Sequence, residues 1–294
     1  MSESTLRIAT LNIGSLFEPD WEQRRHEIVS WLDHLEPDVV CLQEVQESDS
    51  VPNTAGWIAD AAARKWHWIF GGHEVPAGSW PDRSMRFGSA VLSQWKIDEH
   101  QLHRLGLASR PAGFTSGMPW ELFHVSTAGL DLYSTHLAAA PADARHRVKQ
   151  VQEIDDIIVA SRDDRDNLMN PKRDAMPPIL CGDFNAEPDS DEIRFLSSLH
   201  VIDGRSTFYQ DAWRMAGDET SGFTSDWRDN PISASLNIHR KRIDYIFVGD
   251  PFLRTGNGGR VMHSELAFHT KRTGIVASDH RGLIADIVWP TRPS

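Results

Sequence analysis

Side chains that can bind a metal ion or transfer a proton recur in this sequence at the ends of short apolar runs. Each is a carboxylate, an amide or an imidazole. The set comprises Asn12, Glu44, His136, Asp183, Asn185, Asp244, Asp279 and His280. Any one of them alone would be read as a turn residue or part of a solvated face. Repeated along the whole chain, they predict one common site, because the ends of strands and their loops converge at an edge of a sheet.

Hydrolysis of a phosphate ester requires this combination of residue types. The phosphate is anionic and repels a nucleophile, and a divalent metal offsets that charge and polarises an oxygen. Magnesium prefers oxygen ligands, commonly one or two carboxylates together with water molecules. A base must orient or deprotonate the attacking water, and donors must hold the charge that grows on the phosphate. The residue types therefore predict a hydrolase that uses Mg²⁺ or Mn²⁺.

Nine short runs rich in apolar and β-branched residues predict the strands that position these side chains. The runs are 6–13, 38–45, 67–70, 88–93, 121–127, 130–137, 178–185, 242–249 and 282–289. Helical patterns fall at 21–35, 143–161, 190–199 and, more weakly, 56–65. Residues 204–241 and 250–281 are expected to be rich in loops. Mixed strands with interspersed helices predict an α/β fold with helices outside the sheets, built as one domain over residues 1–294.

The composition is that of an ordinary globular protein with an excess of acidic residues. Thirty basic and 42 acidic residues give a net charge of −12. Tight binding to long DNA is not expected, because broad nucleic-acid affinity needs cations that neutralise phosphates. Cys41 and Cys181 lie in apolar runs and are expected to be buried free thiols. With no run approaching the roughly 18–20 residues of a membrane span and no signal pattern, we expect a cytoplasmic protein without an obligate protein partner.

The order of the motifs resembles the endonuclease/exonuclease/phosphatase superfamily. That superfamily contains pancreatic-type deoxyribonucleases, apurinic endonucleases, neutral sphingomyelinases, inositol polyphosphate 5-phosphatases and deadenylases. The matching segments are ATLNI, LQEV, GSAVLS, STHL, GDFNAEPDS, RIDYIFV and SDHRGLIADI, which span residues 9–287. The resemblance implies a four-layer αββα sandwich, in which two packed mixed β-sheets are flanked by helices and the site lies at one edge. The motifs are specific for the superfamily and unspecific for the substrate.

The resemblance also implies a role for each residue of the set. Glu44 would be the main metal carboxylate, with Asn12 beside it and Asp279 nearby. Asp183 would position or deprotonate the attacking water, and Asn185 would hold the phosphate oxygens.

Two histidines would act on the phosphate itself. His280 would contact the scissile phosphate and stabilise its developing charge, while Asp244 would bond its other nitrogen and fix its tautomer. In some accounts of the family His280 is instead the base, so the division of labour between His280 and Asp183 stays open. His136 would bind phosphate or assist the leaving group.

Three residues outside the set are candidate substrate contacts. Arg86 could supply a cation near Ser89, which stands where many relatives have Asn. Arg242 closes the cationic run 240–242 beside Asp244, and such a run could hold phosphates or be a solvated face. Trp227, in an expected loop, could stack on a base or a ring.

One further pair could support the site from behind. Arg147 and Gln150 lie three residues apart in the helical pattern that follows His136, so they share a helix face. They are either a structural brace or a surface pair.

The reaction favoured by these residues is phosphodiester hydrolysis by in-line attack of water. A nuclease acting on single-stranded or short DNA or RNA is one alternative, and a phosphomonoesterase for a small or lipid-derived phosphate is another. A non-catalytic binding module on the same fold would be expected to lack Glu44, Asp183, Asp244 or His280, and all four are present.

Overall fold

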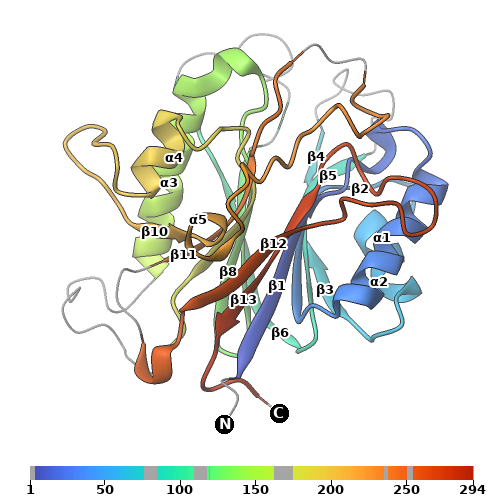
Figure 1. The fold of residues 1–294 in the computed structure, drawn as a ribbon, viewed down its shortest axis with the longest axis horizontal. Helices are drawn as coiled ribbons and strands as arrows, with labels where there is room; N and C mark the ends of the chain where they lie inside the picture. Colours follow the sequence, from blue (N-terminus) through green and yellow to red (C-terminus); the bar gives the residue numbers. More distant parts are fainter. Residues whose placement is uncertain are drawn as a thin grey trace.

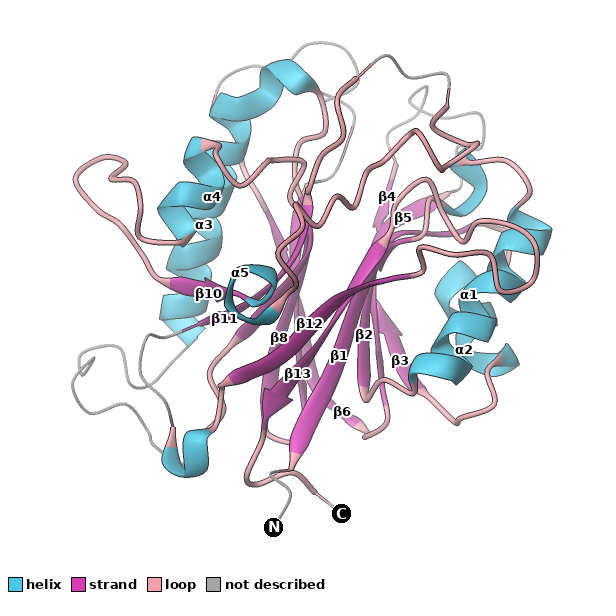
Figure 2. Ribbon diagram, in the orientation of Figure 1, coloured by secondary structure: helices cyan, strands magenta, loops and turns pink. Residues whose placement is uncertain are grey.

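The computed structural model describes residues 4–75, 85–108, 118, 120–161, 175–234, 238–249 and 254–293. In these residues two β-sheets lie face to face, and helices cover their outer faces (Figures 1 and 2). The first and last strands pair with each other, so both ends of the chain lie at the same end of the molecule (Figure 1). The predicted four-layer α/β sandwich is confirmed.

Both sheets are mixed, as predicted. In spatial order the first contains β12 (Val261–Ala267), β13 (Gly282–Val288), β1 (Thr5–Asn12), β2 (Val39–Glu47), β5 (Arg86–Ser93) and β3 (His67–Phe70), and β4 (His73–Glu74) pairs with β5. The second contains β10 (Tyr209–Asp211), β11 (Asp244–Gly249), β9 (Ile179–Asp183), β8 (Leu130–His136), β7 (Glu121–Thr127) and β6 (Ile97–Arg104). Strands β1 and β2 pair in parallel, as do β8 and β9, and the remaining pairings are antiparallel.

Helices α1 and α2 lie beside the first sheet, and α3 and α4 lie beside the second (Figure 2). Their bounds are Trp21–Leu35 (α1), Thr54–Ala61 (α2), Ala144–Ser161 (α3), Asp191–Leu196 (α4) and Ala212–Ala216 (α5), with 3-10 turns at Ser15–Phe17, Pro141–Asp143 and Thr255–Asn257. The first helix ends where Glu36 takes a left-handed conformation (φ 48°), just before Pro37. Within the described ranges no helix is both long and apolar enough to cross a bilayer.

Three apolar layers hold the four structural layers together. One joins α1 and α2 to the first sheet, with Ile28 and Leu32 packed among residues such as Leu11 and Leu42. A second joins α3 and α4 to the second sheet. The third lies between the sheets and contains both cysteines. As expected, they are buried free thiols and form no disulfide with each other.

Four strands, β4, β6, β10 and β12, were not predicted. β4 and β10 have only two and three residues, which is too short to show an apolar pattern. β6 is an edge strand whose sequence, IDEHQLHR, is polar on both faces, and most of its residues are exposed. β12 is likewise an edge strand, with a break in its register between Val261 and His263. Apolar patterning identifies strands by their buried faces, so it misses strands that bury little. The third predicted helix is also shorter than expected, since it ends at Leu196, two residues before Ser198 takes a positive φ.

Gly182 allows β8 and β9 to approach each other beside the site. Its φ is +144°, and a Cβ built on it would lie 1.9 Å from the carbonyl oxygen of Thr135. Residues with a side chain almost never adopt that backbone region. The glycine therefore sets the spacing of the two parallel strands that end in His136 and Asp183.

We expect Gly182→Ala to lower the free energy of unfolding by about 3 kcal/mol or more, because the clash is with backbone and cannot be relieved by a rotamer change. Gly129→Ala is the matched control: its φ is +81°, but no atom lies within 4 Å of the added Cβ. It should cost only about 1–2 kcal/mol. Urea unfolding of both variants measures the difference, and equal losses would contradict the clash.

Candidate active site

Strand pairing brings three of the predicted residues side by side. In the second sheet His136 on β8 is in register with Asp183 on β9, and Asp183 is in register with Asp244 on β11. In the first sheet Asn12 closes β1 opposite Gln43, the residue before Glu44. The ends of these strands therefore present one group of polar side chains, as the sequence predicted.

Asn12 links the two sheets at this edge. Its Nδ2 donates to Glu44 Oε1 at 3.0 Å and to Asp183 Oδ2 at 3.1 Å. Its Oδ1 accepts from the backbone N–H of Gly14 at 3.1 Å, and Ser278 Oγ donates to its carbonyl oxygen at 2.7 Å. Asn12 thus has partners on both sides of its amide, and it holds two carboxylates at a fixed separation.

Glu44 occupies an irregular point of β2. The pairing of β2 with β5 shifts register between Leu42 and Val45, and Glu44 has φ +57°. Such bulges redirect side chains next to active sites. Burial and then the charge of Asp279 raise the pKa of Glu44 to about 8, against the lowering effect of the hydrogen bond from Asn12. A carboxyl group in this position is stabilised by a cation.

His280 and Asp244 form the bonded pair that the resemblance implied. His280 Nδ1 lies 2.9 Å from Asp244 Oδ2, so Nε2 faces Asp183 at 3.8 Å and Asp279 at 3.9 Å. Burial lowers the pKa of His280, but the carboxylates of Asp244, Asp279 and Asp183 outweigh it and raise this pKa well above its usual value. Burial raises the pKa of Asp244 to about 6, although the charge of His280 opposes the shift. The three carboxylates therefore favour the protonated form of His280.

His136 has the opposite electrostatic character. Its Nε2 lies 3.6 Å from Asp183 Oδ2, and its ring makes an edge contact with Trp120 at 5.8 Å between centroids. Burial lowers the pKa of His136, while the charge of Asp183 acts against this.

Asn185 lies two residues after Asp183 and has a left-handed conformation (φ 48°). Its backbone N–H donates to Asp183 Oδ1 at 2.8 Å, and its side-chain amide donates to the carbonyl oxygen of Leu137 at 3.1 Å.

The carboxylates of the site fit a divalent cation. Asp183, Asp244 and His280 offer ligand atoms within 4.8 Å of one another. However, Asp244 and His280 already bind each other, which leaves the oxygen-rich side formed by Glu44 and Asp279 as the better place for a metal. Oxygen donors with crowded negative charge suit Mg²⁺ or Mn²⁺.

The geometry agrees with comparisons to known proteins. The model described as the Endonuclease/Exonuclease/phosphatase family matches residues 9–280. This chain belongs to the endonuclease/exonuclease/phosphatase family. Members of the family are phosphoesterases and nucleases that depend on divalent metals.

Alignments with individual relatives cover nearly all of this chain. Nocturnin of Xenopus laevis is 24% identical over 287 residues, which are 93% of this chain and 66% of Nocturnin, so the chain spans just under two thirds of that relative. An endonuclease/exonuclease/phosphatase of Beutenbergia cavernae DSM 12333 superposes with a TM-score of 0.68 at 21% identity, covering 97% of this chain and 71% of that one. D. rerio TDP2 complexed with single strand DNA product gives 0.65 at 18%, covering 97% and 99%. The two structural matches show the fold.

Among the described residues, none of the three candidate substrate contacts forms a hydrogen bond or ion pair with the eight residues of the site. Arg86 pairs with Glu47 at 2.5 Å. Arg242 is buried and pairs with Asp211 at 2.7 Å, so its charge is already compensated. This ion pair disfavours the predicted contact between Arg242 and substrate. Trp227 is 38% exposed, and its role in stacking stays a prediction.

Of the two interpretations left open for Arg147 and Gln150, the structure supports the brace and not the surface pair. Both side chains are buried. Gln150 Oε1 accepts from the N–H of Ala138, and Arg147 Nη1 donates to the carbonyl oxygens of Ala138 and Ala140 at 2.9 and 3.0 Å. Arg147 also pairs with Glu192 at 2.7 Å. The pair therefore holds the segment that follows His136.

Sequence reasoning missed one acidic residue at this edge, Glu18. The ideal Cβ position of Gly14 lies 2.8 Å from Glu18 Cγ and 3.3 Å from Asp279 Oδ1, so the two acids flank the same glycine. Burial and then the charge of Asp279 raise the pKa of Glu18. A Glu-Pro step in a loop carries no pattern that would have identified it.

Arg24 was also missed, because an arginine in a helical pattern reads as solvated. It is fully buried on α1, and its guanidinium donates to backbone oxygens in two loops. The acceptors are the carbonyls of Ile13, Ser15, Glu18, Pro19 and Ala277. One loop follows Asn12 and the other precedes Asp279, so a single side chain fixes the two loops that carry residues of the proposed metal site.

We expect Arg24→Ala to lower the free energy of unfolding by about 3 kcal/mol or more, because several buried carbonyls lose their donor together. The matched control is Arg25→Ala on the same helix. Arg25 pairs with Glu22 and lies 3.9 Å over the ring of Trp57, and its loss should cost about 1 kcal/mol or less. Urea unfolding in EDTA measures both. Similar losses for the two variants would show that Arg24 is no brace.

The raised pKa of Glu44 predicts a pH dependence in the metal-free protein. In the folded state Glu44 has a pKa of about 8, whereas in the unfolded chain its carboxyl group has the ordinary pKa of 4.5. Stability should therefore fall as pH rises between these values, by about 2 kcal/mol or more. Urea unfolding in EDTA from pH 5 to pH 8 measures this change.

Comparison with Glu44→Gln isolates this effect. His136 contributes with the opposite sign, because its pKa is lowered on folding, and it is common to both proteins. The wild type should lose more stability than Glu44→Gln over the same pH range. Parallel pH profiles would contradict the raised pKa.

Proposed function

We propose that this protein is a Mg²⁺- or Mn²⁺-dependent phosphoric ester hydrolase that cleaves a phosphodiester by in-line attack of water. The observation that carries the proposal is the arrangement around Asp183. Its Oδ2 lies within 4 Å of both His136 and His280 and accepts from Asn12. One carboxylate is thus held between two imidazoles and an amide.

On the metal side, Glu44 and Asp279 would hold the cation, with Asn12 fixing the position of Glu44. The cation would neutralise the phosphate and polarise one of its oxygens. Arg24 acts indirectly, since it holds the loops on which Asn12 and Asp279 stand.

On the chemistry side, Asp183 is the group that orients and deprotonates water. Its Oδ1 is held by the N–H of Asn185, which leaves Oδ2 facing the site. The water oxygen forms a bond to phosphorus while the ester P–O bond on the opposite side breaks. One proton of the water passes to Asp183, the leaving oxygen takes up a proton from the surrounding solvent, and Asp183 then returns its proton to solvent.

We assign charge stabilisation to His280 and the role of base to Asp183. The neighbouring carboxylates raise the pKa of His280, which favours the form that can donate from Nε2 to a phosphate oxygen. Asp244 keeps Nδ1 protonated and so fixes which nitrogen faces the phosphate. His136 and Asn185 complete the set of polar groups around the phosphate.

A nuclease acting on single-stranded or short nucleic acid is the favoured form of this activity. The support is structural: D. rerio TDP2, whose fold this chain shares, was solved with a single-strand DNA product. A phosphomonoesterase for a small or lipid-derived phosphate has no comparable support.

We expect turnover of bis-(p-nitrophenyl) phosphate with Mg²⁺ or Mn²⁺, and its loss in EDTA. His280→Ala and Asp183→Ala should each lower kcat by about a hundredfold or more, because each removes a group that acts in the transition state. The control is His100→Ala, on the exposed strand β6. Release of p-nitrophenol measures all four proteins. Equal rates with and without chelator would overturn the metal role, and full activity in either site variant would overturn that residue's role.

A further inference from the structure

A pocket of about 500 Å³ opens next to the candidate site, and Asn185 lines it. Its walls combine apolar side chains, among them Pro141 and Ile243, with polar ones, among them Ser190 and Lys241. Pockets of this size hold small organic ligands. Because Asn185 also donates its backbone N–H to Asp183, the pocket begins where the proposed chemistry takes place.

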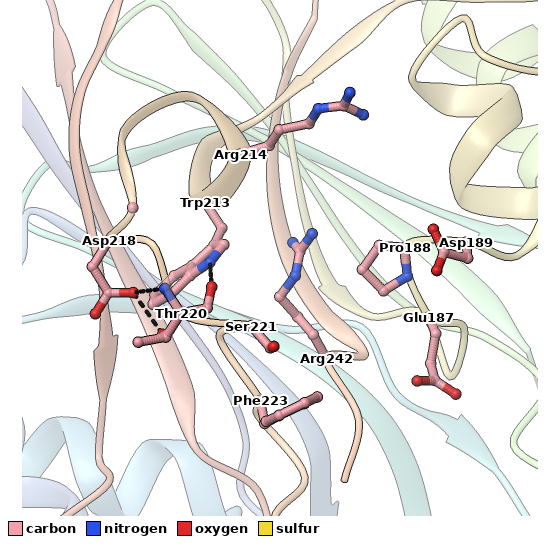
Figure 3. A pocket seen from close by; sticks show the side chains of 11 residues that line it. Glu187, Pro188, Asp189, Trp213, Arg214, Asp218, Thr220, Ser221, Phe223 and Arg242 are labelled. Atoms are coloured by element: carbon pink, nitrogen blue, oxygen red, sulfur yellow. Dashed lines mark hydrogen bonds between the residues drawn. The ribbon is translucent and has the colours of Figure 1, made fainter. Parts of the chain in front are cut away.

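A second pocket, of about 440 Å³, adjoins the first along the segment from Glu187 to Asp189 (Figure 3). Its walls include Trp213, Phe223 and Arg242, and Arg242 lies between Trp213 and Pro188 in this view (Figure 3). None of the eight residues of the candidate site lines it. The pocket at Asn185 is therefore the one that a group attached to the scissile phosphate would enter.

The cations around the pocket at Asn185 are mostly compensated. Arg147 pairs with Glu192 at 2.7 Å, and His239 pairs with Glu187 at 2.5 Å. Lys241 forms no ion pair with any residue that the structure describes. Its charge is therefore available to a ligand.

The two arginines next to Lys241 in the sequence are also compensated by acidic residues. Arg240 lies 3.7 Å from Asp226 and over the ring of Phe223, and Arg242 pairs with Asp211. The cationic run thus contributes one available charge and not three. Lys241 is also held by its backbone, whose N–H and carbonyl oxygen each bond to Ser225 at 2.9 Å.

Two acidic residues line the same pocket: Glu187, which pairs with His239, and the exposed Asp189. The pocket as a whole therefore has no strong positive field. An anion would be bound there by direct contact with Lys241, at one position of the ligand.

We propose that this pocket receives one substituent of the scissile phosphate, and that Lys241 contacts a second phosphate carried by that substituent. A single-stranded oligonucleotide is the substrate class with this chemistry, because its phosphates are separated by one nucleoside. The nucleoside fills the partly apolar pocket between Asn185 and Lys241. The inference rests on the proposed phosphodiesterase function and extends it to a specificity-determining residue.

The test compares two substrates that differ in the second phosphate. Thymidylyl-thymidine (TpT) has only the scissile phosphate, and the trinucleotide TpTpT has one more. With Mg²⁺ at fixed ionic strength, wild-type protein should have a higher kcat/KM for TpTpT. Lys241→Ala should lower the ratio of the two kcat/KM values about tenfold, and Lys241→Arg should retain most of it, since a charge-assisted hydrogen bond is lost only in the first.

Two controls keep the result specific. Lys65→Ala removes an exposed lysine that follows α2 on the other side of the molecule, and its substrate ratio should equal that of the wild type. Binding of fluorescently labelled TpTpT in EDTA, followed by anisotropy, should weaken about tenfold in Lys241→Ala. This readout requires no catalysis.

The two proposals fail in different ways. Failure of wild-type protein to cleave bis-(p-nitrophenyl) phosphate, TpT and TpTpT with either metal overturns the proposed function. Turnover by the wild type with an unchanged substrate ratio and unchanged trinucleotide binding in Lys241→Ala overturns the role of Lys241 and leaves the function standing.

Discussion

Repulsion among carboxylates at one edge of the two sheets is the constraint on which the site depends. The charges of Asp279 and Asp183 raise the pKa of Glu44, and the charge of Asp183 also raises that of Asp244. Asp244, Asp279 and Asp183 together raise the pKa of His280. In water such charges would separate. Here Asn12 donates to two of them, and His280 takes a proton and binds a third. The remaining excess of negative charge on the side of Glu44 is what a divalent cation would offset.

Holding these groups together requires backbone that ordinary strands do not provide. Glu44 and Asn185 both have positive φ values, and Gly182 allows β8 and β9 to approach closely. Each costs free energy, and such strain persists only where surrounding contacts fix the conformation. Arg24 supplies those contacts on the first sheet, and Arg147 with Gln150 supplies them on the second. The two buried arginines have corresponding tasks, since each donates to carbonyls of a segment that follows a site residue.

The features of this fold that leave an apolar pattern in the sequence were predicted. Buried strands have apolar periodicity, so the strands that end in Asn12, His136 and Asp183 were placed correctly, and so was the fold. The edge strand β6 buries little and has no such pattern. Arg24 and Glu18 were not predicted for a related reason: a charged residue in a helix or loop is interpreted as solvent-exposed unless its partners are known. Those partners are backbone carbonyls and a distant aspartate, and only the fold brings them near.

The same reasoning explains why the cationic run was the least informative motif. In a chain with 42 acidic and 30 basic residues, most cations near the surface can find a carboxylate. Arg86 pairs with Glu47, and Arg242 pairs with Asp211. A count of positive charges therefore overstates what a substrate can contact, and the useful quantity is the number of cations left uncompensated beside the site. On the described surface of the pocket at Asn185 that number is one, and it belongs to Lys241. If Lys241 has the proposed role, the position of this one charge, and not an overall attraction, would select a short anionic substrate.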